Sequence, residues 1–112
     1  HIVGKVLVQG LGIGDASVTG ELCVVENTKE ALDKFCDGNI LVAPSTNNEI
    51  LPVIKRASAI IVEEGGQACH AATVGLALDI PVIVGATNAT RILKTGSVVT
   101  VDAERGLVLR CD

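Results

Sequence analysis

The sequence predicts an α/β domain with a parallel central sheet and a second sheet packed on it. Short apolar runs that can form buried strands alternate with segments whose apolar residues recur at helical spacing, and both ends of the chain are rich in strand patterns. Hydrophobic residues make up 48% of the 112 residues and charged residues 20%, which excludes a disordered chain. At this length we expect residues 1–112 to form a single domain.

The first predicted strand covers residues 3–9, where apolar and polar residues roughly alternate. The run Gly-Leu-Gly-Ile-Gly at 10–14 then ends it. This run lacks the spacing of a nucleotide-binding loop and no helical pattern follows it, so we expect a β-turn or a bulge. Residues 19–25 predict the next strand.

The first predicted helix covers residues 29–36, with Thr28 as its N-cap and Gly38 at its end. Its inward face is predicted to carry Ala31, Leu32 and Phe35. Phe35 is the only aromatic residue, so the core must be built from Val, Ile, Leu and Ala.

The rest of the chain continues the alternation. Strands are predicted over 40–43, 59–62 and 82–84, and helices over 47–56, 71–78 and 89–94. Residues 98–101 and 107–109 can pair as a hairpin across the charged turn 102–106, which ends in glycine.

The most informative segment is the run Glu-Glu-Gly-Gly-Gln-Ala-Cys-His-Ala-Ala-Thr at 63–73. It places His70 where a glycine turn leads from a strand into a helix. Helix N-termini attract anions through their unpaired N–H groups, and the glycines let the backbone approach a ligand closely. This pattern suits a histidine that accepts a phosphoryl group. The alternative is a glycine turn whose histidine only caps the helix.

Two blocks of the sequence resemble the phosphohistidine (swivelling) domain of enzymes that make or use phosphoenolpyruvate, such as phosphoenolpyruvate synthase, pyruvate phosphate dikinase and enzyme I of the sugar phosphotransferase system. Their signature reads Gly-Gly-x-Thr-Ser/Cys-His-Ala-Ala, a short helix, then Gly-Ile-Pro-x-Val-x-Gly. The matching residues are Gly65, Gly66, Cys69, His70, Ala71, Ala72, Ile80, Pro81, Val82, Val84 and Gly85. The resemblance implies a three-layer β/β/α fold with the histidine loop at the carboxyl ends of the central strands.

Within this group, the chain is most similar to the extra C-terminal domain of some bacterial pyruvate kinases. The run Val-Gly-Leu-Ala-Leu-Asp-Ile-Pro-Val-Ile-Val-Gly at 74–85 carries that similarity, which extends from about residue 4 to about residue 110. Two positions depart from the phosphoryl-transferring members: Ala68 stands where they usually have Thr, and Leu76 where they usually have Arg. Arg holds phosphate through two parallel hydrogen bonds, so its loss weakens the case for fast phosphoryl transfer.

The resemblance implies His70 as the candidate phosphohistidine. The residues implied to hold phosphate are Gly65, Gly66, Cys69, Thr73 and Thr46. Thr46 can reach the histidine loop because both loops leave the same edge of the sheet, although an N-cap of the second helix is an equal alternative for it. Cys69 has a plainer alternative as a small side chain tolerated in a tight turn. Glu63 and Glu64 would repel phosphate, so we expect them to have structural roles.

We expect an accessory domain of a pyruvate kinase, which transfers phosphoryl between phosphoenolpyruvate and ADP, with roles in assembly, stability or regulation. The alternatives are an active phosphohistidine carrier, as in phosphoenolpyruvate synthase, and a stand-alone module that senses an anion. The expected partners are the catalytic domain of the parent enzyme and neighbouring subunits, with phosphoenolpyruvate or phosphate as ligands. We expect no cofactor in this chain, and Mg²⁺ and K⁺ in the parent's catalytic domain. The isolated domain is not expected to be a complete enzyme.

The net charge and the cysteine content argue against several further classes of function. A net charge of −4 and the lack of stacking aromatics argue against nucleic acid as a partner, and the apolar runs are too short to cross a membrane. The four cysteines contain no CxxC spacing and there are only two histidines, so no metal site is predicted. We expect four reduced thiols in a cytoplasmic protein.

Overall fold

One eight-stranded mixed sheet runs through the computed structural model, which describes residues 4–111. The strands are β1 (Val6–Gln9), β2 (Leu11–Ile13), β3 (Ser17–Val24), β4 (Ile40–Ala43), β5 (Ala59–Val62), β6 (Val82–Val84), β7 (Val98–Asp102) and β8 (Leu107–Arg110). The helices are α1 (Thr28–Lys34), α2 (Leu51–Ile54), α3 (His70–Leu78) and α4 (Ala89–Ile92), with a 3₁₀ turn η1 (Asn48–Ile50) before α2.

The strand order is β1-β8-β7-β3-β4-β5-β6-β2, and the middle of the sheet, from β3 to β6, is parallel. The long strand β3 joins the two halves of the sheet. Its first part pairs with β7 in antiparallel fashion, from Ser17 with Asp102 to Glu21 with Val98. Its last part pairs with β4 in parallel, from Leu22 with Ile40 to Val24 with Val42. The sheet therefore folds over at β3 and forms two layers that share this strand.

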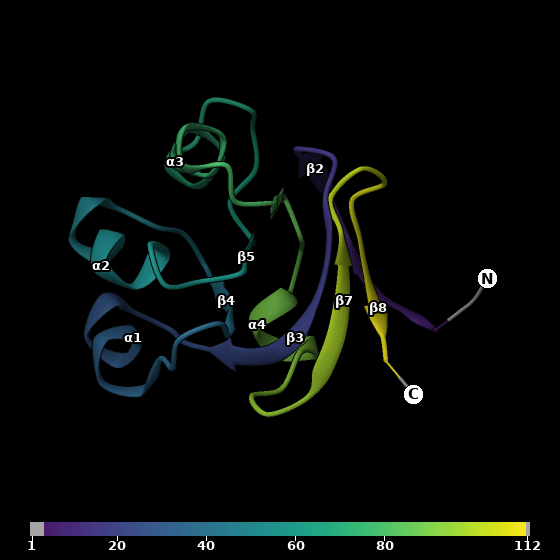
Figure 1. The fold of residues 1–112 in the computed structure, drawn as a ribbon, viewed down its shortest axis with the longest axis horizontal. Helices are drawn as coiled ribbons and strands as arrows, with labels where there is room; N and C mark the ends of the chain where they lie inside the picture. The colour runs from purple at the N-terminus through teal and green to yellow at the C-terminus, as the bar shows by residue number, and fades with distance from the viewer. Residues whose placement is uncertain (1–3, 112) are drawn as a thin grey trace.

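Two hydrophobic cores make this a β/β/α sandwich, as predicted. One core lies between the parallel strands and the layer of α1, α2 and α3, which Figure 1 shows together on one side of the sheet. The other core lies between the parallel strands and the antiparallel strands β1, β7 and β8, and α4 contributes to it. Strands β4 and β5 are buried along their whole length because both of their faces are covered. This explains their uninterrupted apolar sequences.

The glycine-rich run at 10–14 was wrongly predicted as a turn or bulge, because it contains strand β2, which pairs with β6. Glycine is required there by close backbone contact. A Cβ on Gly12 would lie 1.6 Å from the carbonyl oxygen of Ala103, and one on Gly10 would lie 2.3 Å from that of Val84. These glycines let neighbouring backbones meet, so a residue that usually weakens strands is needed inside one.

Details of two helices also differ from the prediction. The N-cap of α1 is Asn27, whose Oδ1 accepts a hydrogen bond from the Glu30 N–H, and not Thr28. Leu32 is 51% exposed and does not face the core. The single helix predicted over 47–56 is a 3₁₀ turn followed by the one-turn helix α2, in which Pro52 occupies the first turn because it has no N–H to donate.

All four cysteines are free, as predicted, with Cys23 buried and Cys36 and Cys111 exposed. Burial raises the pKa of the Cys23 thiol. None of the helices formed by the described residues is long and apolar enough to cross a membrane.

Candidate functional site

Three loops meet at the carboxyl ends of β4, β5 and β6, where ligands bind in open α/β sheets. The loop after β5 is fixed to its neighbours through the backbone of Glu64. The Glu64 N–H donates to the Pro44 carbonyl after β4 (2.9 Å), and the Glu64 carbonyl accepts from the Gly85 N–H after β6 (2.8 Å). The parallel sheet thus sets the position of the glycine turn from both sides.

His70 is the first residue of α3 and is half-buried. Its Nδ1 lies 2.7 Å from Thr46 Oγ1, and its Nε2 lies 2.8 Å from Asn48 Oδ1. Thr46 is the one polar residue buried among those that the structure describes, at 7% exposure. The loop after β4 therefore holds the imidazole from both of its nitrogens.

These contacts fit a neutral imidazole. The Thr46 hydroxyl donates to Nδ1, and the N–H at Nε2 donates to Asn48 Oδ1. If the Asn48 amide is turned over, the roles reverse, with the amide donating to Nε2 and the N–H at Nδ1 donating to Thr46. In either arrangement neither ring nitrogen is free to attack a phosphoryl group.

The glycine turn and the start of α3 form an uncapped helix N-terminus beside the imidazole. No side chain caps α3, whose N-cap residue is Cys69. Gly66 has φ = +102°, a conformation that favours glycine, and a Cβ on Gly65 would lie 3.6 Å from the Cα of Gly85. The first-turn N–H groups of such a helix have no partner within the helix and can receive an anion.

The structure distributes the other predicted residues unevenly. Thr46 contacts His70, so of its two alternatives the contact with the histidine is found, and Asn47 is the residue that caps η1. Thr73 is exposed on α3 and its hydroxyl donates to the Cys69 carbonyl at 3.1 Å, so it is not aimed at the imidazole. Glu63 has the structural role that was predicted, because its Oε2 accepts from both the N–H and the hydroxyl of Thr90.

Asn48 is the contact that the sequence reading missed. It lies two residues beyond Thr46 after the same strand, so it also leaves the edge of the sheet from which the histidine loop leaves. Asn residues in loops commonly form turns or caps, so the sequence alone does not distinguish an Asn that contacts a histidine from these common cases. Among residues 4–111 no group of three or more His, Cys, Asp or Glu side chains could hold a metal ion.

The family described as "PEP-utilising enzyme, mobile domain" matches residues 35–106. A pyruvate kinase of Bacillus licheniformis is 48% identical over 110 residues, which are 98% of this chain and 19% of that enzyme. A probable phosphoenolpyruvate synthase of Archaeoglobus fulgidus is 45% identical over 94% of this chain, which is 14% of that protein. The chain therefore spans less than one fifth of the length of these relatives.

Solved structures have the same fold. A chain of Thermococcus kodakaraensis aconitase X superposes with a TM-score of 0.69 and 25% identity, covering 94% of this chain and 98% of that one. The structure of an Enzyme I protein gives a TM-score of 0.60 and 26% identity over 70% of this chain and 33% of that one. Together with the sequence relatives, these matches show that the chain belongs to the mobile-domain family of PEP-utilising enzymes.

Proposed function

We propose that this chain is the accessory mobile domain of a cytoplasmic pyruvate kinase-type enzyme, in which His70 and the start of α3 form an anion site without carrying phosphate during turnover. The catalytic body, with the Mg²⁺ and K⁺ that it would hold, lies in another part of that enzyme. The domain contributes to its assembly, stability or regulation.

The observation that carries this proposal is the occupation of both imidazole nitrogens. A histidine that accepts phosphoryl must present an unprotonated, accessible nitrogen to the donor. Here Thr46 and Asn48 both hold the ring, and neither is a cation that could draw a phosphate to it. Leu76, six residues along the helix, is 71% exposed and adds no charge.

The same geometry suits reversible binding of a small anion. The N–H groups at the start of α3 and the N–H at Nε2 of His70 can donate to a phosphate or carboxylate oxygen, with Thr46 holding Nδ1, and Gly65 and Gly66 leave space for the anion. Such a ligand would have to displace Asn48 from Nε2. We expect binding that is weak because no Lys or Arg takes part in the His70 contacts.

The second candidate is an active phosphohistidine carrier. The 45% identity with a probable phosphoenolpyruvate synthase favours it, since the chain matches that protein almost as well as it matches pyruvate kinases. In this case Asn48 turns away and exposes Nε2 to the phosphoryl donor.

The two candidates are separated by labelling the full-length enzyme with ³²P-phosphoenolpyruvate, followed by a search for acid-labile, base-stable label. We expect no such label, and unchanged turnover of phosphoenolpyruvate and ADP in His70→Ala. Label that disappears in His70→Ala would establish the carrier instead.

Asn48→Ala serves as the sensitised variant, because it frees Nε2 while leaving the Thr46 contact in place. It should bind phosphate more tightly than the unmodified chain, as followed by chemical shifts of the His70, Ala71 and Ala72 amides. Thr46→Val is the matched control that releases only Nδ1. Amide chemical shifts that do not change when phosphate is added, in the unmodified chain and in both variants, would contradict the anion site.

A further inference from the structure

The outer face of α3 is apolar although it is exposed. The helix has nine residues and none from Ala71 to Leu78 is charged. Ala71, Ala72 and Gly75 face the core, while Leu76 is 71% exposed, the largest value among the exposed large hydrophobic residues of the described chain. Thr73 is the one polar residue from Ala71 to Leu78, and a helix with so few polar residues is typical of one that a partner also covers on its outer side.

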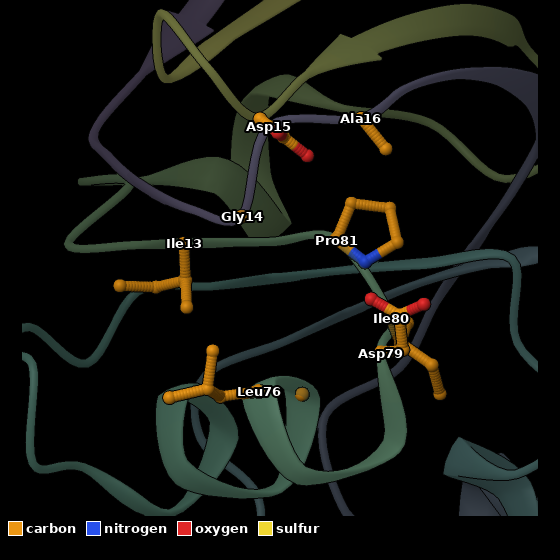
Figure 2. Close-up of a pocket in the computed structure, with 9 residues that line it drawn as sticks. Ile13, Gly14, Asp15, Ala16, Leu76, Asp79, Ile80 and Pro81 are labelled. Carbon is orange, nitrogen blue, oxygen red and sulfur yellow. The ribbon is translucent and has the colours of Figure 1, made fainter.

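A small pocket of about 50 Å³ opens beside Leu76. Its walls come from the end of β2 and the following turn, and from the C-terminal end of α3. Figure 2 shows Ile13 and Leu76 pointing toward one another across it, with Asp15 above and Asp79 beside Pro81. The pocket therefore combines apolar walls with two carboxylates.

The charges of this pocket are not balanced from within the described residues. Neither Asp15 nor Asp79 belongs to any of the ion pairs between residues 4 and 111. The C-terminal end of α3, which Asp79 caps, carries partial negative charge and its last turn has no basic residue. Three sources of negative potential thus converge on a pocket whose walls are apolar.

A Lys or Arg side chain fits both properties. Its aliphatic stem can lie against Leu76 and Ile13, while its cationic head reaches the carboxylates. A small apolar molecule would leave the carboxylates unpaired, and a free metal ion would not cover the exposed side chain of Leu76. The complementary surface is an apolar patch that carries one basic side chain.

We propose that the outer face of α3, comprising Thr73, Leu76 and Ala77, docks together with this pocket on the catalytic body of the parent enzyme, and that a Lys or Arg of that body enters the pocket. This inference rests on the proposed function, because it takes its partner from the more than four fifths of a pyruvate kinase relative that this chain does not span. The docking contact at Leu76 lies about 9 Å from His70 along the axis of α3.

The test measures the reactivity of a thiol placed on the docking face. Leu76→Cys and Leu32→Cys are each made in the 112-residue chain and in the full-length enzyme, and alkylation is followed peptide by peptide by mass spectrometry. Leu32 is the matched control, since it is a leucine that is 51% exposed on α1. We expect both thiols to react rapidly in the 112-residue chain, and Cys at 76 to react at least tenfold more slowly than Cys at 32 in the full-length enzyme. Equal rates at the two positions in the full-length enzyme would overturn the proposal.

The charge of the pocket is tested in the same enzyme. The double variant Asp15→Asn/Asp79→Asn should restore much of the reactivity at position 76, whereas Asp33→Asn/Glu21→Gln, which removes two exposed carboxylates away from the pocket, should not. Protection that both double variants leave unchanged would overturn the role of the basic side chain. Turnover of phosphoenolpyruvate and ADP is measured in parallel. Normal turnover with an unprotected position 76 refutes only the docking, whereas protection without turnover refutes only the proposed function.

Discussion

Helices α1 and α3 pack on the same side of the sheet, with α2 between them, yet they are stabilised in different ways (Figure 1). Helix α1 is capped by side chains: Asn27 Oδ1 accepts from the Glu30 N–H at 2.9 Å, and Glu30 Oε1 accepts at 2.6 Å from the N–H of Glu26, the residue before the N-cap. A salt bridge from Lys34 to Glu30 spans its outer face at 2.8 Å. Helix α3 has neither a side-chain cap nor a charged outer face.

The difference indicates what each helix does. Residues of the same segment cap the N-terminus of α1 and form the salt bridge on its outer face. Helix α1 therefore needs no packing partner other than the sheet. In α3 the N-terminus stays open beside His70 and the outer face stays apolar, which leaves one end for an anion and one face for a protein. The stability of α3 therefore depends on its inner face to a greater degree.

Replacing Gly75 should reduce stability the most, because a side chain at this position would push α3 away from the sheet. A Cβ there would lie 2.1 Å from Val82 Cγ2 and 3.0 Å from the Ile80 carbonyl oxygen, and Val82 is fully buried. Gly75→Ala should lower the free energy of unfolding by about 1–3 kcal/mol, measured by urea denaturation. Ala77→Gly on the exposed face is the control and should cost about 0.5–1 kcal/mol. A Gly75→Ala chain more stable than the original would show that the helix can shift outward.

Removing the cap of α1 should come next. Asn27→Ala is expected to lower the free energy of unfolding by about 1 kcal/mol, since the Glu30 N–H loses its acceptor. Thr28→Ala at the neighbouring position should change it by less than about 0.5 kcal/mol, because Thr28 lies inside the helix and does not cap it. Urea denaturation of the two variants decides between them, and a larger loss for Thr28→Ala would place the cap there.

Supplying a cap to α3 should have the opposite sign. Cys69 has the extended backbone of an N-cap residue (φ −69°, ψ 162°), and a serine there can accept a hydrogen bond from the first turn. Cys69→Ser should raise the free energy of unfolding by up to about 1 kcal/mol relative to Cys69→Ala, and should weaken phosphate binding by competing for the same donors. Thermal unfolding and phosphate titration measure both effects. Equal stability of the Ser and Ala variants would show that this N-terminus already has a partner.

The smallest effect concerns pH. The hydrogen bond from Lys34, followed by that from the Glu26 N–H, lowers the pKa of Glu30. The stabilisation from ionised Glu30 is therefore fully present above the unfolded carboxyl's pKa of about 4.3, and is lost as the pH falls through the lower folded value. The thermal midpoint of Glu30→Gln should fall less than that of the original chain between about pH 5 and pH 3. Lys34→Ala should reduce the same difference, and parallel curves for all three chains would contradict this account.

The sequence predicted the parts of the fold that depend on local patterns. Strands β4, β5 and β6 and the hairpin of β7 and β8 followed from apolar runs and a glycine turn. The start of α3 at His70 followed from the glycines before it. Strand β2 did not, because the need for Gly12 arises from Ala103, which is some 90 residues away in the chain. Long-range backbone contact leaves no local signal.

The candidate site was predictable to a similar extent. His70 and Thr46 could be brought together because loops that follow neighbouring parallel strands leave the same edge of the sheet. The second contact, from Asn48, depends on the conformation of the loop, which is set by the cap at Asn47 and by Pro52 further along. The side-chain rotamers that aim both residues at one imidazole cannot be obtained from residue types alone.

Strand β3 has a consequence for how the molecule folds. Its residues 17–21 pair with residues 98–102 of β7, so they have no partner in the sheet on that side until residues 98–102 are available. The adjacent residues 22–24 can pair earlier, with β4, across a much shorter loop. We expect the α/β half to assemble first and the antiparallel half to close last, at a rate limited by the entropy of joining distant segments. A chain still emerging from the ribosome would then hold an unpaired, extended half-strand that is open to wrong partners.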